Sequence, residues 1–359
     1  MQEVSVGFLS FVGPNYSRSS TLLNFKSQGI EKTYFHVPGK FLKSIRWIFK
    51  NRADFRKMDV LVVMSPCHIL TPALKIITNK PIFLDAGWSL TDGVLSRGFR
   101  IQNLYKLPMI FAVDLISMHC ADLVLVESSL QRNRTQKFFL LSRKKVQISY
   151  TGLDESQFKN SIEFHAKESE LLTELRENIE EKAKSLVVLF RGKVNRESGF
   201  ETICEAAKIL SNEATFIFIL GERDLVPRDL ENVIRLSNVS SLEIMEIYGM
   251  AQVAVGQISC HPRLKYTIPH KAFEAGYFKK AYVTSDSNGI REIYNDESVS
   301  YLSKSNSETL AKAILTLANE KSRLMFEVEI KLQYEHLLSQ EVINKQFAQI
   351  IRDFASQEP

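Results

Sequence analysis

Residues 267–286, TIPHKAFEAGYFKKAYVTSD, begin with a helix start and end with a short apolar strand. Thr267 can cap the N-terminus of the helix, and Pro269 stands where a missing N–H costs little. Lys271 and Glu274 follow three residues apart, so both lie on one face of the first turns. A cation, a carboxylate and free helix-end N–H groups together suit a phosphate beside a sugar hydroxyl. The alternative is an ordinary surface helix that carries a salt-bridged pair.

Length and composition indicate a two-domain globular protein. At 359 residues the chain is long for one hydrophobic core, and 45% apolar with 24% charged residues is ordinary for this class. The net charge of +5 is too small to indicate nucleic-acid binding by itself. The cysteines are far apart, which argues against a zinc site or a disulfide framework and fits a reducing compartment. They are Cys67, Cys120, Cys204 and Cys260.

No segment predicts a membrane-spanning helix. The longest apolar stretch, residues 107–126, contains Asp114, His119 and Asp122, whereas a spanning helix needs about 20 mostly apolar residues. Residues 1–10 read as a strand rather than as a signal peptide. We therefore expect a cytoplasmic protein, for which binding to the inner face of the membrane stays open.

Strands and helices alternate along the chain in the manner of doubly wound α/β domains. Residues 4–11 read as a strand, Gly13 lies in the following turn, and residues 17–28 read as a helix. The turn lacks GxGxxG, so a dinucleotide site is poorly supported; Gly13 either lets a ligand approach the backbone or only turns the chain. Further strands are expected at residues 32–36, 59–64, 81–84, 122–127, 145–149, 185–190, 215–220, 252–255 and 281–284.

The same alternation runs through the chain twice, with a charge-rich stretch between the two runs. We therefore expect an α/β protein made of two Rossmann-like, doubly wound domains. The first domain spans residues 1–165, a helical connection spans 166–184, and the second domain spans 185–330. The last segment, residues 331–359, is expected to be a helix that packs back on the first domain.

Residues 39–57, GKFLKSIRWIFKNRADFRK, form a basic amphipathic segment with seven Lys or Arg and one acidic residue. On a helical wheel, its aliphatic side chains gather on one side and suit the domain core. The other side carries a tryptophan among four cations, which favours contact with an anionic lipid surface. These residues are Lys40, Lys43, Arg46, Trp47 and Lys50. A solvated face with one exposed tryptophan is the alternative, and nucleic-acid binding comes third.

The loop DAGWSLTD, residues 85–92, directly follows the buried strand at residues 81–84. Ligands of parallel sheets gather beyond the carboxyl ends of the strands. Asp85 and Asp92 are therefore the candidates in the first half for a polar contact with a substrate, unless the loop is a plain connecting turn.

Four stretches carry a resemblance to a known family. They are ADLVLVES at 121–128 together with 146–158, FRGK at 190–193 through Gly199 and Ala206, residues 238–254, and residues 267–286 with Asn288 and Gly289. In this order and at this spacing they resemble the GT-B glycosyltransferases, specifically the retaining family four (glycosyl transferases group 1) of bacterial polysaccharide and lipopolysaccharide synthesis. The resemblance implies two Rossmann-like domains that face each other across a cleft.

The resemblance implies transfer of a hexose-type sugar from a nucleotide-diphosphate sugar to a glycan or lipid-linked acceptor, with no cofactor and no metal. Three residues are the expected catalytic ones: Asp85 on the acceptor side, Lys193 facing the diphosphate, and Glu274 holding the ribose hydroxyls. Further substrate contacts are expected from Gly13, Arg18, Asp92, Gly192, Arg196, His270, Lys271, Asn288 and Gly289.

Two positions depart from the family pattern. Tyr266 stands where many members have a second glutamate that contacts the donor sugar, and Ser198 stands where a lysine is usual. Arg191 or Arg196 is the candidate for a replacement cation. Two other functions therefore stay open. One is a nucleotide-sugar epimerase of the same architecture, which needs no acceptor; the other is a partner protein that keeps the fold and has lost the chemistry.

Overall fold

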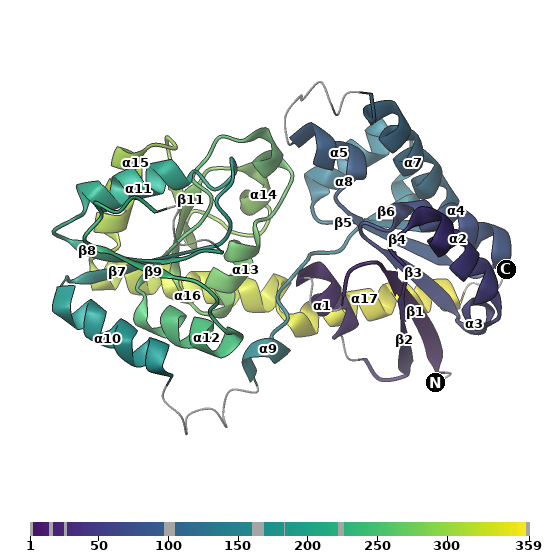
Figure 1. Ribbon diagram of the computed structural model, residues 1–359, viewed down its shortest axis with the longest axis horizontal. Coiled ribbons are helices and arrows are strands. Elements are labelled where there is room, and N and C mark those ends of the chain that lie inside the picture. Colours follow the sequence, from purple (N-terminus) through teal and green to yellow (C-terminus); the bar gives the residue numbers. More distant parts are fainter. Residues whose placement is uncertain are drawn as a thin grey trace. The chain divides into compact units, whose positions relative to one another are not determined.

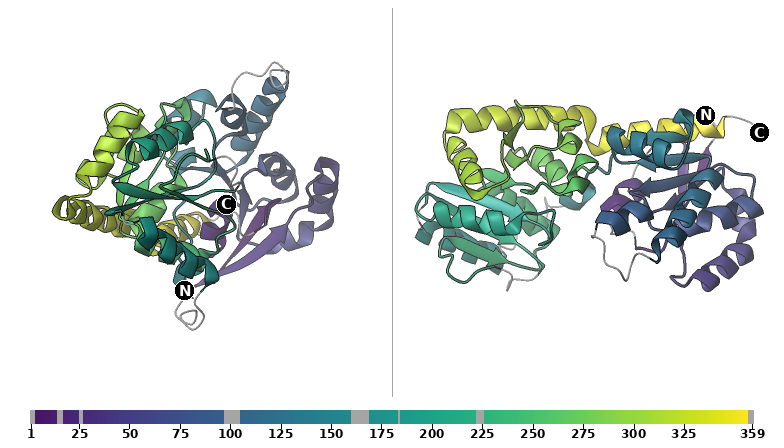
Figure 2. Two further views of the ribbon diagram at one scale, coloured as in Figure 1. Left: turned by 60° about the vertical axis from the view of Figure 1, so that its left-hand side comes forward. Right: turned by 90° about the horizontal axis from the view of Figure 1, so that it is seen from above.

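A computed structural model describes residues 3–13, 17–24, 27–96, 105–159, 169–182, 184–221 and 226–356 (Figures 1 and 2). The chain divides into two compact units. Unit 1 consists of Met1–Asp154 and Gln340–Pro359, and unit 2 consists of Glu155–Ser339. No helix in the described ranges is long and apolar enough to cross a membrane.

Unit 1 is built on a parallel six-stranded sheet in the order β2-β1-β3-β4-β5-β6. The strands are β1 (Val4–Ser10), β2 (Ile30–His36), β3 (Val60–Met64), β4 (Ile82–Gly87), β5 (Leu123–Val126) and β6 (Val146–Ile148). The helices are α1 (Ser17–Leu23), α2 (Phe41–Lys50), α3 (Arg52–Lys57), η1 (His68–Leu70), α4 (Thr71–Ile77), α5 (Leu90–Ser96), α7 (Leu107–Cys120), α8 (Ser129–Phe138), η2 (Arg143–Lys145) and α17 (Gln340–Ala355).

The two faces of this sheet bury different side chains, because successive residues of a strand point to opposite faces. Leu61 and Val63 of β3 lie in the core beneath α2, α3, α4 and α7. Val60 and Val62 lie in a second core beneath α1 and α17. Burial on both faces explains why the strands read as continuous apolar runs in the sequence.

Unit 2 contains a second parallel six-stranded sheet in the order β12-β11-β10-β7-β8-β9. The strands are β7 (Leu186–Arg191), β8 (Ala214–Ile219), β9 (Val233–Leu236), β10 (Val253–Val255), β11 (Ala281–Ser285) and β12 (Val299–Leu302). The helices are α9 (Ser156–Lys159), α10 (Glu170–Lys182), α11 (Phe200–Ile209), α12 (Ser241–Met250), η5 (Pro262–Lys265), α13 (His270–Tyr277), α14 (Asn288–Arg291), α15 (Ser307–Thr316) and α16 (Glu320–Leu337).

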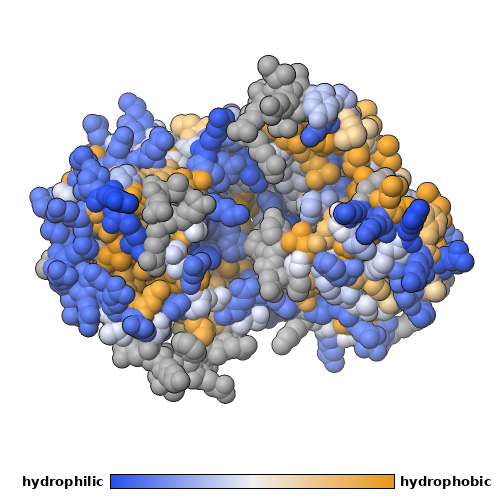
Figure 3. Space-filling model, in the orientation of Figure 1, coloured by the Kyte–Doolittle hydropathy of each residue, from blue (hydrophilic) through white to orange (hydrophobic). Residues whose placement is uncertain are grey.

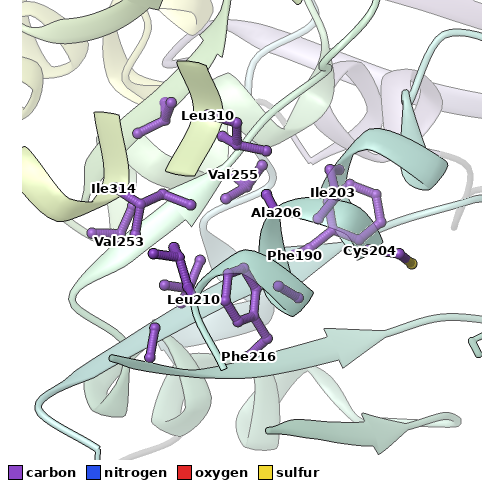
Figure 4. Close-up of a cluster of buried hydrophobic side chains, with 14 of the residues drawn as sticks. Phe190, Ile203, Cys204, Ala206, Leu210, Phe216, Val253, Val255, Leu310 and Ile314 are labelled. Atoms are coloured by element: carbon purple, nitrogen blue, oxygen red, sulfur yellow. The ribbon is translucent and has the colours of Figure 1, made fainter. Parts of the chain in front are cut away.

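One hydrophobic core of unit 2 lies between this sheet and the helices α11 and α15 (Figure 4). Phe190 of β7 packs edge-on against Phe218 of β8, with ring centroids 6.0 Å apart, and both rings are fully buried. Aromatic pairs in this arrangement are worth about 1 kcal/mol beyond the burial of their area. Phe190 directly precedes Arg191, the last residue of β7.

Two strands and one helix cap differ from the sequence-based expectations for secondary structure. Strands β9 and β12 were not expected; both are edge strands, short and only partly apolar, so their sequence signal is weak. The prediction that Thr267 caps α13 is wrong. Its hydroxyl donates to the carbonyl of Arg263 at 3.1 Å, and Pro269 is the N-cap residue without a side-chain hydrogen bond.

Candidate active site

The candidate site of unit 2 lies where the loop after β7 meets the first turn of α13. Arg191 ends β7, and Gly192 and Lys193 begin the loop. A Cβ atom on Gly192 would lie only 2.8 Å from Cε of Lys271, which belongs to α13. Gly192 also has a φ of +144°, a backbone conformation that favours glycine. The glycine therefore lets the loop and the lysine side chain approach closely.

Glu274 is the centre of a hydrogen-bonded cluster in this site, and only 1% of the residue is exposed. Its Oε1 accepts a hydrogen bond from the guanidinium of Arg191 and lies 3.0 Å from Nδ1 of His270. Its Oε2 accepts a hydrogen bond from the hydroxyl of Tyr248 at 2.8 Å. Burial acts to raise the pKa of Glu274, but Arg191 and His270 outweigh it and lower the pKa to about 2. The carboxylate is therefore ionised and held in one orientation.

These contacts exclude the interpretation of α13 as an ordinary surface helix. Every residue from Lys271 to Gly276 is buried. Glu274 pairs with Arg191, 83 positions away in sequence, and with His270 four positions earlier. A pair of this kind is costly to break from one side, because an uncompensated charge is then left buried.

Lys271 has a different environment from that of Glu274. The residue is 9% exposed, and its Nζ has no hydrogen-bond partner within the described part of the chain. The nitrogen lies 3.6 Å from the centroid of the Phe190 ring, a cation–π distance. Burial lowers the pKa of Lys271 to about 7; Glu274 opposes this shift, and Arg191 adds to it. This amine is therefore buried without a hydrogen-bond partner in the described ranges.

Two further glycines of the site are required by close packing of the backbone. Gly199, with a φ of +63°, begins α11, and a Cβ there would overlap the carbonyl oxygen of Ile258. A Cβ on Gly289 would overlap the carbonyl oxygen of Thr267. Gly289 therefore holds α14 against the segment that leads into α13, whatever contact it makes with a ligand.

The remaining sequence-predicted residues of unit 2 lie at the surface or close the loop. Within the described ranges, the exposed side chains of Lys193, Arg196 and Asn288 make no hydrogen bond or ion pair. Ser198 is fully buried, and its hydroxyl donates to the carbonyl of Asn195 at 2.7 Å. Ser198 therefore closes this loop through its contacts with Asn195. Tyr266 is the C-cap residue of η5.

Unit 1 has its own buried ionic cluster at the carboxyl ends of its strands. Asp85 of β4 is 1% exposed, and both of its oxygens accept from Nε of Arg18 at 2.8 Å. Nη1 of Arg18 donates to the Thr151 hydroxyl at 3.0 Å and lies 3.7 Å from Oε1 of Glu127. Gly87, with a φ of +54°, approaches this guanidinium closely. The predicted residues Arg18 and Asp85 therefore lie together, and Asp85 is engaged by a cation.

The other predicted residues of unit 1 lie outside that cluster. Asp92 on α5 accepts from Nη2 of Arg134 on α8 at 2.7 Å and from the hydroxyl of Ser89 at 3.0 Å. Gly13 is exposed, and a Cβ there would meet nothing within 4 Å. Steric constraint therefore gives no reason for a glycine at position 13.

The tryptophan of the basic segment is not on an exposed membrane-facing side. Trp47 packs against Phe55 at a centroid distance of 5.6 Å and against Phe35 at 6.4 Å, and it borders the core of unit 1. The interpretation of Trp47 as an indole among surface cations is therefore corrected, because the helix turns this ring inward. The exposed apolar side chains of α2 are Leu42 and Phe49.

The structure adds residues that the sequence reasoning missed or left undecided. Tyr248 was missed; it belongs to the Glu274 cluster because its ring stacks on Phe278, directly after α13, and its hydroxyl reaches Glu274. Arg191 had been one of two candidates for a free cation, yet it is bound to Glu274. Glu127 and Thr151 complete the cluster around Arg18, and Thr151 donates to Glu127 at 2.9 Å. Their places after β5 and β6 are the one signal that could have identified them, because ligands gather at these strand ends.

No group of three or more His, Cys, Asp or Glu side chains suited to a metal ion occurs in the described part of the chain. The groups found in this part of unit 2 are the Arg191 guanidinium, the buried amine of Lys271, the ionised carboxylate of Glu274 and the first turn of α13. Such an arrangement can bind an anion beside a polyol.

Comparison with known proteins gives a family match and a fold. Residues 173–331 match the family model described as Glycosyl transferases group 1. No curated protein matches the sequence. The expected resemblance to this family is therefore confirmed over a stretch that contains Lys193, Lys271 and Glu274.

Solved structures share the fold across the whole chain. The crystal structure of Anabaena Alr3699/HepE in complex with UDP has a TM-score of 0.73 and 14% identity, covering 98% of this chain and 100% of that one. An α,α-trehalose 6-phosphate synthase from Burkholderia multivorans has a TM-score of 0.69 and 11% identity, covering 99% of each chain. A glycosyltransferase from Rickettsia africae ESF-5 has a TM-score of 0.67 and 11% identity, covering all of both chains. The predicted fold, two Rossmann-like domains of the GT-B type, is confirmed.

Proposed function

We propose that this chain is a glycosyltransferase that moves a hexose-type sugar from a nucleotide-diphosphate sugar to a glycan or a lipid-linked acceptor in cell-surface polysaccharide synthesis. The group 1 match over residues 173–331 supports glycosyl transfer. The observation that carries the donor site is the cluster of Glu274, Arg191 and the unpartnered Lys271 around Gly192. We further propose a retaining reaction without a metal ion, as the family resemblance implies.

Each member of the cluster has a role that its geometry supports. When the bond between sugar and diphosphate breaks, negative charge builds on the phosphate oxygens, and fixed cations stabilise that charge best. Lys271 and the first N–H groups of α13 would face the diphosphate from below the loop, and Lys193 would face it from the exposed side of the same loop. Glu274, fixed by Arg191 and Tyr248, would accept hydrogen bonds from the ribose hydroxyls.

The internal bonds of Glu274 bear on how the ribose would bind. A carboxylate has about four lone-pair sites, and three are used by Arg191, His270 and Tyr248. A ribose hydroxyl would therefore take the remaining site or displace His270, whose side chain is 35% exposed. In either case Arg191 would keep the carboxylate charged and in place.

We propose that unit 1 supplies the acceptor side through the Arg18–Asp85 pair. Because Asp85 is bound by Arg18, it would act by holding the guanidinium in place rather than as a free base. Arg18, Glu127 and Thr151 at the strand ends would then position the acceptor hydroxyl. Asp92, bound by Arg134, would support the neighbouring helix α5.

We propose that the acceptor is presented at an anionic membrane surface that binds the outer side of the helices α2, α4, α7 and α8. The exposed large hydrophobic side chains of unit 1, as far as it is described, lie on or beside these helices and not on α1 or α17. They are Leu42, Phe49, Ile76, Tyr105, Met109, Ile116, Phe138 and Leu140. In Figure 3, hydrophobic residues appear at the surface in the region of α7 and α8. Residues 39–80 carry nine Lys or Arg and two Asp, including the predicted Lys40, Lys43, Arg46 and Lys50.

Vesicle sedimentation tests this surface. At low salt, vesicles of equal phosphatidylcholine and phosphatidylglycerol should pull down the full chain. Reversing Lys40, Lys43 and Lys50 to glutamate should weaken binding at least a hundredfold, because each surface cation contributes about 1 kcal/mol. Reversal of the exposed Lys208, Lys304 and Lys321 in unit 2 is the matched control. Equal binding of both triple variants would refute the electrostatic attachment.

The glycosyltransferase proposal is tested in two steps. The first is a thermal-shift screen of nucleoside diphosphates and their sugars, starting with UDP and UDP-glucose because the HepE structures contain them. A specific ligand raises Tm, since it binds only the folded state. The second is release of the nucleotide from the best ligand in the presence of membrane extract. Glu274→Gln and Lys193→Ala should each lower that rate about a hundredfold, with Lys208→Ala as the matched control.

The outcomes separate the proposed activity from its alternatives. Turnover that requires the extract supports glycosyl transfer. Conversion of the nucleotide-sugar without extract would indicate an epimerase. Binding with no turnover under any condition would indicate a partner protein that has lost the chemistry, and normal turnover by both site variants would refute the assignment of the site.

A further inference from the structure

We propose that a nucleoside diphosphate bound to unit 2 draws a proton onto Lys271, so that ligand binding and protonation of this side chain are linked. The linkage rests on the proposed donor site and adds to it a proton that must be taken from solution. The neutral amine accepts that proton from the acid form of the buffer, and the resulting ammonium pairs with a phosphate oxygen.

The position of the amine is the first support. Nζ of Lys271 has no hydrogen-bond partner within the described ranges and lies over the face of Phe190. It is directed at the loop after β7, where a Cβ on Gly192 would lie 3.3 Å from it. Because Gly192 has no side chain, only backbone atoms of the loop lie beside the nitrogen, which is itself buried. A buried polar group with no partner is rare and is usually explained by its function.

The charges around Lys271 are the second support. Glu274 faces it from the same helix and favours the ammonium, whereas Arg191 faces it from the end of β7 and opposes the ammonium. Glu274 is already offset by Arg191 and His270 and is hydrogen-bonded by Tyr248 from α12. The protein therefore provides a carboxylate that is largely neutralised by other partners. The amine lacks a counter-ion of its own until an anion arrives.

The pKa of Lys271 sets the size of the effect. Burial lowers it to about 7 in the free protein, so at pH 8 about nine-tenths of the side chains are neutral and at pH 6 about one-tenth are. A diphosphate in contact favours the charged form and raises the pKa again. Binding should therefore take up close to one proton at pH 8 and about a tenth of one at pH 6. Affinity should fall up to tenfold per pH unit above pH 7.

Isothermal titration calorimetry of the full chain with UDP measures this proton directly. The binding heat is recorded at pH 8 in HEPES and in Tris, which release a proton with different enthalpies, and the difference gives the number of protons taken up. At this pH the diphosphate itself is fully ionised, since its last pKa is about 6. The expected uptake is about 0.9 proton at pH 8, falling to about half a proton at pH 7, the range in which the ligand itself carries almost no titrating proton.

Three variants assign the proton to a residue. Lys271→Arg keeps a cation that does not titrate, so it should bind UDP with the same heat in both buffers. His270→Gln removes the neighbouring ring that could take the same proton and should leave the uptake unchanged. Lys208→Met, on the exposed side of α11, should behave as the parent protein.

The results distinguish this linkage from the proposed function. Tight UDP binding with no buffer dependence at pH 8 would overturn the linkage and leave the donor site standing. Loss of the uptake in His270→Gln, with retention in Lys271→Arg, would assign the proton to histidine and overturn it as well. No binding of any nucleoside diphosphate by the folded parent protein would instead overturn the proposed function.

Discussion

Replacing Lys271 by methionine should make unit 2 more stable at neutral pH, although it removes a residue of the candidate site. The side chain is 9% exposed, and burial lowers its pKa from 10.5 to about 7. The unfolded chain therefore binds more protons than the folded chain between these two values. At pH 7 this difference costs the folded state about 4 kcal/mol, at about 1.4 kcal/mol per pKa unit.

Methionine removes this cost and keeps most of the packing. Its unbranched thioether is close to lysine in length and can rest on the Phe190 ring, where sulfur makes favourable contacts. We expect Lys271→Met to raise the free energy of unfolding of unit 2 by about 4 kcal/mol at pH 7. For a unit of this size that corresponds to a rise in Tm of about 10 °C.

The stability difference between the two proteins should depend on pH. A lysine whose folded-state pKa is lowered makes the protein more stable as pH rises from about 7 toward 10.5, because the unfolded state loses its excess proton over that window. The methionine variant has no titrating group at this position. Its advantage over the parent protein should therefore shrink from about 4 kcal/mol at pH 7 to about 1 kcal/mol at pH 9.5.

Urea unfolding of both proteins at pH 7 and pH 9.5 is the assay, with Lys208→Met as a control at an exposed, ion-paired lysine. The control should change stability by less than about 1 kcal/mol. A methionine variant less stable than the parent protein at pH 7 would refute the reasoning. A stability difference between the two proteins that does not decrease from pH 7 to pH 9.5 would also refute it. Residues at functional positions commonly lower the stability of the folded state.

Three further predictions concern the two clusters and one backbone contact. Gly199→Ala should destabilise unit 2 by about 3 kcal/mol in urea unfolding, because its φ is +63° and the new Cβ would overlap the carbonyl of Ile258; Gly221→Ala, whose Cβ meets nothing within 4 Å, should change it by less than about 0.5 kcal/mol. Glu274→Gln should lower the free energy of unfolding by about 3 kcal/mol at pH 7, because the lowered pKa of the carboxyl group stabilises the fold above pH 4.5. The difference between variant and parent protein should vanish as the pH of the unfolding measurement approaches 2. Arg18→Met should cost about 4 kcal/mol because it leaves Asp85 charged and buried, and adding Asp85→Leu should restore part of that stability; strictly additive losses would contradict a coupled pair.

Much of the fold follows from local pattern. Strands such as β3 and β8 are buried on both faces, so their apolar runs stand out in the sequence, and the helices between them predict parallel connections. The edge strands β9 and β12 escaped notice because they are short and carry partly exposed residues. Trp47 was misplaced because a helical wheel ranks residues by angle and does not show that Phe35 and Phe55 lie beside this ring.

The candidate site was likewise predictable from the sequence only in part. The sequence alone determined that Lys271 and Glu274 share the first turns of a helix that leads into a short buried strand, and that this stretch resembles a nucleotide-sugar site. Only the tertiary structure decided which partners these two side chains have and whether they are charged. Arg191 and Tyr248 lie 83 and 26 positions from Glu274 along the chain and give it two strong partners, whereas Lys271 receives no hydrogen bond from any described residue. The spacing of residues in the sequence determines which of them share a helix face. Burial and partners distant in sequence determine which of these residues is charged, and both arise only when the chain folds.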